Sequence, residues 1–201
     1  MGDLSRALGS DLSRAAFRRL LQTGAPARVS ELAGDLGRPA EEIVAAVEGL
    51  NNEGRIRLDR EGRVVGAAGL SIGPDRHRID IGDRTFWTWC AYDVLGIFGA
   101  LRASGAARST SPHSGESLEV HFRHGRPEPT TLVVFRPDHA FMSCCANVYE
   151  QWCPNSNFFE SREASSTWSK AHGMNGRVLG LTEAAELATA NWEPLAEGLR
   201  P

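Results

Sequence analysis

One segment, residues 85–101 with the sequence TFWTWCAYDVLGIFGAL, constrains the fold of this chain more than any other. It carries a single charge, Asp93, and a single thiol, Cys90. A carboxylate in an apolar helix costs on the order of several kcal/mol unless it is neutralised or paired. Positions i and i+3 of a helix share a face, so Cys90 and Asp93 should point toward one place. The segment therefore predicts a buried helix that carries a candidate site.

Two interpretations of this pair stand side by side. In the functional one, nearby aromatic side chains exclude water and raise the pKa of Asp93, so that its carboxyl group can donate a proton. In the structural one, Cys90 is an ordinary buried cysteine and Asp93 satisfies backbone donors early in the helix. A second group of thiols favours the functional interpretation.

That second group lies in residues 141–159, FMSCCANVYEQWCPNSNFF, and comprises Cys144, Cys145 and Cys153. The segment has no CxxC or HxxxH pair, and adjacent cysteines do not easily serve one tetrahedral ion, which argues against a structural zinc site. Thiolates select soft metals such as mercury or copper(I). Linear two-coordination requires only one thiol from each segment, so the sequence predicts a soft-metal site between them.

Charge and hydropathy limit the possible partners and location. The formal net charge is −3, which gives no reason to expect general binding to nucleic acid. The N-terminus lacks the apolar run of a secretory signal, and the longest apolar segment is short for a membrane span and contains Asp93. We therefore expect a cytoplasmic protein without membrane contact, in which structural disulfides are not expected.

The first part of the chain has the pattern of a winged helix, and we assign residues 1–69 to such an N-terminal domain. Its expected elements are helices at 12–21, 29–36 and 40–52, then a hairpin at 55–65. The third helix would enter the major groove, yet it carries Glu41, Glu42 and Glu48 and no basic residue. DNA binding is therefore less expected than a structural or dimerising role.

A small-residue linker, 66–73, should lead into a second domain at 70–201. The second domain should be of the α+β class, with a small, mainly antiparallel sheet. Its expected elements are strands at 77–81 and 85–88, a helix at 89–101, a hairpin of 118–122 with 131–135, a strand at 157–160, a helix at 161–172, a strand at 178–181 and a helix at 182–195 capped by Thr182.

The motif FWTWCAYDVLGIFGAL followed by FMSCCANVYEQW resembles the organomercurial lyases, also called alkylmercury lyases, of bacterial mercury-resistance operons. The similarity covers residues 85–168, and a winged-helix-like N-terminal part also fits that family. The resemblance implies that Cys90 and Cys144 are the catalytic cysteines, that Asp93 is the catalytic aspartate, and that all three contact the mercury of substrate and product.

The same resemblance gives the other cysteines lesser roles. Cys145 corresponds to a dispensable neighbour. Cys153 is extra to the best-known members and is either a buried structural thiol or an auxiliary landing site for mercury, and burial is favoured because free cysteines are usually buried. The chain departs from many members at Ser114, which follows His113 where they have a further cysteine.

The implied activity is protonolysis of the carbon–mercury bond, which gives a hydrocarbon and Hg(II) held by two cysteines. No organic cofactor is required, because the metal belongs to the substrate; small cellular thiols are co-reactants, and the product could pass to a mercuric reductase. Aromatic candidates for the wall around the organic group are Phe86, Trp87, Trp89 and Phe141. Two alternatives remain: a winged-helix regulator that responds to soft metals, and a relative that only sequesters mercury.

Overall fold

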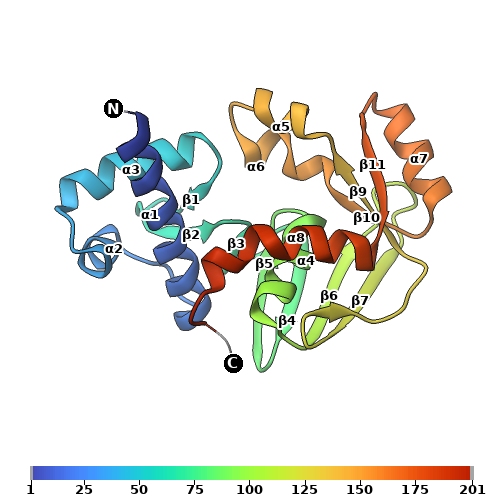
Figure 1. Ribbon diagram of the computed structural model, residues 1–201, viewed down its shortest axis with the longest axis horizontal. Helices are drawn as coiled ribbons and strands as arrows, with labels where there is room; N and C mark the ends of the chain where they lie inside the picture. Colours follow the sequence, from blue (N-terminus) through green and yellow to red (C-terminus); the bar gives the residue numbers. More distant parts are fainter. Residues whose placement is uncertain (1, 200–201) are drawn as a thin grey trace.

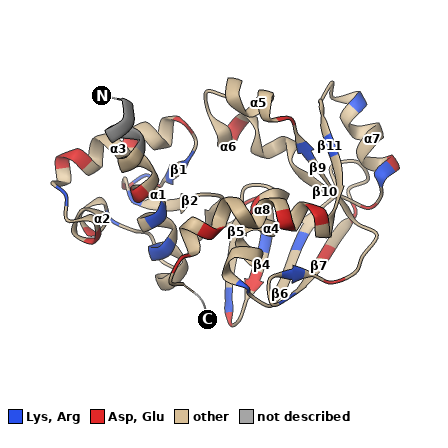
Figure 2. Ribbon diagram, viewed as in Figure 1, with Lys and Arg blue, Asp and Glu red and all other residues tan. Residues whose placement is uncertain are grey.

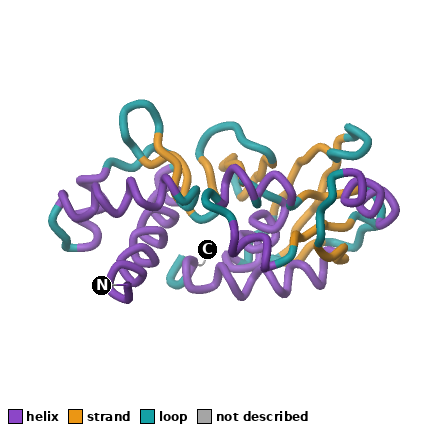
Figure 3. Tube along the Cα trace, turned by 90° about the horizontal axis from the view of Figure 1, so that it is seen from above, coloured by secondary structure: helices purple, strands orange, loops and turns teal. Residues whose placement is uncertain are grey.

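The structure is a computed structural model that describes residues 2–199, with side chains from residue 7 onward. The fold is mixed α+β, as expected, and combines α-helices with two antiparallel sheets (Figure 1). The three N-terminal helices lie together at one end, and the sheets with the remaining helices form the rest of the molecule (Figure 3).

The N-terminal elements largely follow the sequence pattern. They are α1 (Gly2–Thr23), α2 (Val29–Leu36), α3 (Ala40–Asn52), β1 (Ile56–Leu58) and β2 (Val64–Ala67). The two strands form the expected antiparallel hairpin, whereas α1 starts well before the predicted position 12. Acidic side chains and no basic ones mark α3 in Figure 2, and Glu41 and Glu48 are exposed.

The predicted linker at 66–73 is wrong, because these residues belong to the sheet. Strand β3 (Leu70–Ser71) pairs with β2 on one side and with β5 (Arg84–Thr88) on the other. Ala68 and Gly69 both have positive φ, so the small side chains serve a tight turn rather than a flexible connection. One sheet therefore runs across the predicted boundary at residue 69.

That sheet has eight strands, in the order β1-β2-β3-β5-β4-β6-β7-β8. It is antiparallel, as predicted, but larger than the small sheet expected. Its remaining strands are β4 (His77–Ile81), β6 (Gly105–Thr110), β7 (Ser117–Arg123) and β8 (Arg126–Pro127). Along β7 buried and exposed residues alternate, which is typical of a strand with one face on the core.

The predicted hairpin of 118–122 with 131–135 is also wrong. The first segment lies in β7, which pairs with β6 and β8. The second lies in β9 (Val133–Pro137), which forms a separate sheet with β10 (Asn157–Phe159) and β11 (Gly176–Gly180). The tight turn before β8 supplies β7 with a nearer partner, and the fully buried start of β9 suits the centre of a covered sheet.

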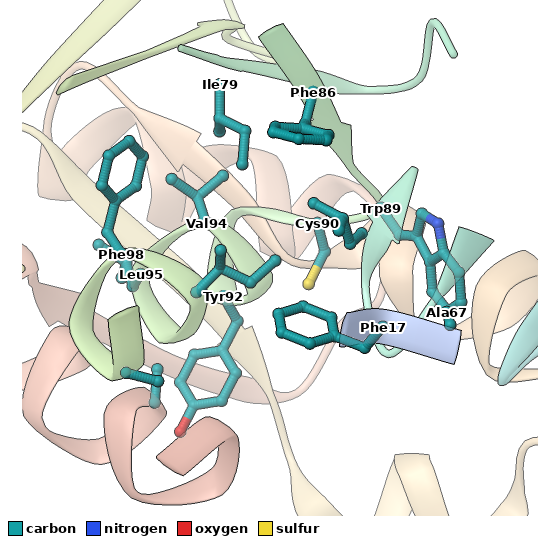
Figure 4. Packing of buried hydrophobic residues seen from close by; sticks show 14 of the residues in the cluster. Phe17, Ala67, Ile79, Phe86, Trp89, Cys90, Tyr92, Val94, Leu95 and Phe98 are labelled. Atoms are coloured by element: carbon teal, nitrogen blue, oxygen red, sulfur yellow. The ribbon is translucent and has the colours of Figure 1, made fainter. Parts of the chain in front are cut away.

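Helix α4 (Ala91–Leu101) is the centre of the molecule. It packs along α8 (Leu181–Ala196) and contacts strands of both sheets, so ten of its eleven residues are buried. Helix α8 begins after Gly180, so the predicted cap at Thr182 is wrong. Figure 4 shows part of this core, with Phe17 of α1 next to the Cys90 side chain and Phe98 farther along α4.

Two short helices, α5 (His139–Cys144) and α6 (Val148–Gln151), carry the second cysteine segment, and α7 (Arg162–Ala171) covers the smaller sheet. Residues 161–172 were expected to be helical, and α7 confirms this. Within residues 2–199, no helix has both the length and the apolar character needed to cross a bilayer.

Candidate active site

Cys90 and Asp93 form the N-terminal cap of α4. The Cys90 N–H donates to Asp93 Oδ2 at 2.9 Å, and the Asp93 N–H donates to Cys90 Sγ at 3.4 Å. This reciprocal pair is a capping box in which a thiol takes the place of the usual hydroxyl. The two side chains thus meet at the helix start, as their spacing predicted, and both are buried.

Cys153 completes a cluster with this pair. It opens the 3-10 helix η1 (Cys153–Asn155), and the two sulfur atoms and an Asp93 oxygen all lie within 4.8 Å of one another. The Ala91 N–H donates to the Ser156 carbonyl at 2.9 Å, which ties the loop that carries Cys153 to the first turn of α4. The burial expected for Cys153 is confirmed, and its thiol faces the candidate site.

Cys144, which was expected to act with Cys90, does not lie in this cluster. Helix α5 has no buried residue, and the exposed Cys144 thiol donates to the Ala140 carbonyl at 2.9 Å. Cys145 is half-buried and donates to the Phe141 carbonyl at 3.2 Å. The chain reaches the core only after α6, where η1 leads into β10.

A signal for Cys153 was present in the sequence. The segment Asn157–Phe159 that follows it is a fully buried strand, and it begins only four positions after the cysteine. Residues directly before a buried strand enter the core with it, whereas the adjacent pair at 144 and 145 has no such anchor. The pattern of buried residues after Cys153 thus indicated that this thiol enters the core.

Burial controls the protonation of the site. It raises the pKa of Asp93 from 3.8 to about 7, against the lowering effect of the Cys90 thiol and backbone N–H. Burial also raises the pKa of Cys90 well above its usual value, and hydrogen bonding with Cys153 adds to this. Burial therefore favours the neutral form of both groups before a cation arrives, and the Asp93 pKa of about 7 leaves both its protonated and its ionised form populated at neutral pH.

The turn between β2 and β3 closes against the carboxyl group. A Cβ atom on Gly69 would overlap the Asp93 side chain, so only glycine allows the backbone this close. The Gly69 carbonyl also accepts the Trp89 N–H at 3.1 Å. The backbone of the turn thus forms one wall of the Asp93 site.

A cavity of about 1000 Å³ reaches the site from the N-terminal helices. Asp93 and Cys153 line it, whereas Cys90 does not. The wall on the N-terminal side consists mainly of small or apolar residues: Leu8, Gly9, Ala45, Ala46, Gly49 and Leu50. Such a space suits an uncharged, apolar group.

The predicted aromatic wall is only partly placed in this cavity. Trp89 lines it, Phe86 is buried in the core, Trp87 is half-buried on the other face of β5, and Phe141 packs at the core edge. Three further aromatic residues line the cavity, Tyr92, Trp152 and Trp192, and the sequence had singled out neither tryptophan.

Two buried thiols and a protonatable carboxyl group beside an apolar cavity define a site that handles soft metal ions and can transfer a proton. The model of the MerB family, alkylmercury lyase, matches residues 70–193. The chain therefore belongs to the alkylmercury lyase family, whose members cleave the carbon–mercury bond of organomercurials.

Individual relatives agree with this assignment. The chain is 32% identical to an alkylmercury lyase of Staphylococcus epidermidis over 174 residues, which cover 84% of this chain and 76% of the relative. It is 27% identical to an alkylmercury lyase of Streptomyces lividans over 188 residues, or 91% and 83% of the two chains. A crystal structure of the mercury-bound form of MerB2 superimposes with a TM-score of 0.79 at 25% identity, covering 91% of this chain and 90% of that one.

Proposed function

We propose that Cys90, Cys153 and Asp93 carry out the protonolysis of organomercurials in this chain. The observation that carries the proposal is the buried cluster in which the two sulfur atoms and a carboxylate oxygen lie within 4.8 Å of one another. Two thiols at this spacing can bind one two-coordinate mercury ion, and the carboxyl group lies beside it. Cys144, which the sequence motif favoured as the second thiol, is exposed and lies outside the cluster.

The steps follow from the chemistry of these groups. A thiol loses its proton when its sulfur binds mercury, so each new sulfur–mercury bond releases one proton. Ionised Asp93 accepts one of these protons, which its raised pKa lets it hold at neutral pH, and the other leaves with the small thiolate that the first cysteine displaces from mercury. Electron donation from two thiolates makes the mercury-bound carbon more basic. Asp93 then protonates that carbon; the carbon–mercury bond breaks, the hydrocarbon leaves, and Hg(II) stays on Cys90 and Cys153.

The wider scheme needs co-reactants but no organic cofactor. Small cellular thiols would deliver the organomercurial and remove Hg(II) by exchange, since a buried two-thiol site would otherwise keep its product. Transfer to a mercuric reductase is compatible with this exchange. A cytoplasmic location would supply both the thiols and the reducing conditions that keep the cysteines free.

The division into an N-terminal part at 1–69, winged-helix-like in its order of three helices and a hairpin, and a catalytic part at 70–201 is likewise proposed. The acidic face of α3 supports a structural role for the first part over DNA binding. Its cavity-lining residues support a contribution to the substrate site.

The test is turnover of phenylmercury in the presence of excess small thiol, measured as benzene released. We expect benzene above the thiol-only control and none above it for Asp93→Ala. Tight mercury binding without benzene from the wild type would instead support a sequestering relative and overturn the lyase mechanism.

The choice between the thiols has its own test. Cys153→Ser should lower benzene release by at least about 100-fold, because it removes a mercury ligand. Cys144→Ser should stay within about twofold of wild type, because that thiol is exposed and outside the cluster. A large loss of benzene release in Cys144→Ser with little loss in Cys153→Ser would instead support the pairing of Cys90 with Cys144 that the sequence motif favoured.

A further inference from the structure

Helix α6, which leads to Cys153, lies directly on the turn that follows α3. The Val148 N–H donates to the Glu53 carbonyl at 2.9 Å, and Asn147 Nδ2 donates to the Asn52 carbonyl at 3.1 Å. A Cβ atom on Gly54 would overlap the Asn147 side chain, so the two backbones meet closely here. The start of α6 is thus docked on the N-terminal part of the chain.

Tyr149 of α6 is held between two arginines that come from different parts of the chain. The guanidinium carbon of Arg57, on β1, lies 4.3 Å from the centre of its ring, and that of Arg76 lies 4.5 Å from it. Arg76 also donates to the carbonyls of Tyr149 and Trp89, at 3.3 and 3.2 Å. Cation–π contacts of this kind are worth about 0.5–2 kcal/mol each.

Asp75 joins these groups into one network. Its side chain is only 2% exposed, and Arg57 lies 2.7 Å from it, whereas Arg76 is 3.6 Å away. The Tyr149 hydroxyl donates to the same carboxylate at 3.4 Å. A buried carboxylate strongly requires its cation, so the Arg57 pair should be rigid.

This network matters for the site because α6 cannot define its own position. A helix of four residues has too few internal hydrogen bonds to be stable alone. Tyr149 precedes Cys153 by four residues, and the Trp152 N–H donates to the Val148 carbonyl at 3.0 Å, so the start of α6 is coupled to η1. Whatever fixes α6 therefore also fixes the second thiol.

We propose that the N-terminal part of the chain positions the second mercury-binding thiol: Arg57, through Asp75 and Tyr149, holds α6 and so sets the distance between Cys153 and Cys90. Arg57 and Tyr149 are positioning residues, since neither belongs to the thiol–carboxylate cluster. The inference rests on the proposed function, because it assigns the hairpin a task in the two-thiol site. It also explains why a lyase retains this N-terminal part.

The chain offers a matched control for Arg57. Arg63 lies next to β2 of the same hairpin, pairs with Asp59 at 2.7 Å and is 36% exposed, against 34% for Arg57. It has no contact with α6 among the ion pairs and hydrogen bonds of residues 2–199. Arg63 also pairs with Glu61 at 2.9 Å, and Asp59 is 21% exposed against 2% for Asp75. Arg57→Gln and Arg63→Gln therefore each remove an ion-paired arginine of similar exposure, one with the proposed link and one without it.

The experiment measures how firmly each variant retains one equivalent of Hg(II) against dithiothreitol, together with kcat and KM for phenylmercury. Arg57→Gln should retain Hg(II) at least about tenfold more weakly and lose kcat by a similar factor, since small displacements of a bound group are costly. Arg63→Gln should stay within about twofold of wild type, and Arg57→Lys, which keeps the charge, should recover part of the loss. Equal retention by Arg57→Gln and Arg63→Gln overturns the inference.

Tyr149→Phe is the second variant, and it carries the test if Arg57→Gln does not fold. It removes only the hydroxyl that reaches Asp75, and we expect Hg(II) retention to fall about threefold or more, with little change in the unfolding midpoint. Retention equal to wild type in this variant overturns the inference. Absence of benzene from the wild type would count against the proposed function alone, because Hg(II) retention is measured without turnover.

Discussion

Asp93 performs two tasks at once. As the third residue of α4 it accepts the Cys90 N–H and closes the helix start, and as a buried acid it lies beside two thiols. An acid at a helix N-terminus is usually stabilised as its anion, but burial outweighs that effect here and raises its pKa to about 7. The structural interpretation of this residue is therefore confirmed by the helix cap, and its burial and raised pKa support the proposed role as a proton donor.

Burial of Asp93 predicts a pH-dependent stability. Between about pH 4 and pH 7 the folded carboxyl group keeps a proton that the unfolded chain has lost, so rising pH destabilises the wild type across this window. Asp93→Asn removes this titration while its amide oxygen can still accept the Cys90 N–H. We expect the free energy of unfolding of Asp93→Asn, relative to that of the wild type, to rise by up to about 4 kcal/mol between pH 4 and pH 7. Above pH 7 this difference should stay constant.

Denaturant unfolding of both proteins at several pH values measures this difference. The other titrating groups are common to both, so they cancel in the comparison. A difference that does not change with pH would show that Asp93 ionises normally.

At the scale of elements, glycines decide how closely neighbouring segments approach. Gly69 lets the β2–β3 turn touch Asp93, and Gly96 and Gly99 let α8 lie against α4, where Cβ atoms would overlap Trp192 and Thr189. Each of these contacts joins segments that are far apart in the sequence. The glycines thus set the geometry around the site without taking part in its chemistry.

The close contact of Gly69 with Asp93 can be tested by comparing Gly69→Ala with the same substitution at Gly62. Gly62 has φ +72° and Gly69 has φ +86°, but only the latter has a neighbour that a Cβ atom would meet. Gly62→Ala should lose about 1 kcal/mol from backbone strain alone. Gly69→Ala should lose a further 1–3 kcal/mol, approximately, and most of its benzene release, because Asp93 is displaced. If Gly69→Ala lost no more stability than Gly62→Ala and kept its turnover, the close contact between Gly69 and Asp93 would be contradicted.

The helix glycine gives a second comparison. Gly99→Ala places a methyl group against Thr189 and should destabilise the protein by about 1–3 kcal/mol. Gly34→Ala, on α2 with open space around it, should stabilise by up to about 1 kcal/mol through helix propensity. Thermal unfolding measures both shifts, and a stabilising Gly99→Ala would mean that α4 and α8 are farther apart than described.

At the scale of the whole molecule, residues from both the N-terminal part and the rest of the chain form the cavity at the candidate site. The cavity is lined by helix residues from the N-terminal part on one side and by Asp93 and Cys153 on the other. The eight-stranded sheet runs through both parts, so their relative position is fixed by backbone pairing. We therefore expect the N-terminal helices to limit the size of the organic group that the cavity accepts.

Filling the cavity from α3 should discriminate between organic groups. Ala46→Trp should lower kcat/KM for phenylmercury by about tenfold or more, while methylmercury should change by less than about threefold, since only the larger group needs the space. Val44→Trp is the control, because Val44 is on the same helix, is 42% exposed and does not line the cavity. Equal effects on both substrates would place the organic group elsewhere.

The sequence by itself determined the local half of the site. The spacing of Cys90 and Asp93 places them on one face of a helix start, and the apolar segment around them dictates burial, because both effects depend on residues within one or two turns. The order of helices in the N-terminal part and the antiparallel character of the strands were likewise readable from local periodicity. So was membership of the family, through its motifs.

Tertiary structure decided which distant thiol lies beside Cys90 and Asp93. The buried strand after Cys153 hinted at its burial, but the docking of α6 on the N-terminal turn and of η1 on α4 brings it to the pair and leaves Cys144 exposed. The partner of β7 and the pairing of residues 66–71 were also decided there. Pairing between remote segments depends on the free energy of the whole packed core, which no local pattern encodes.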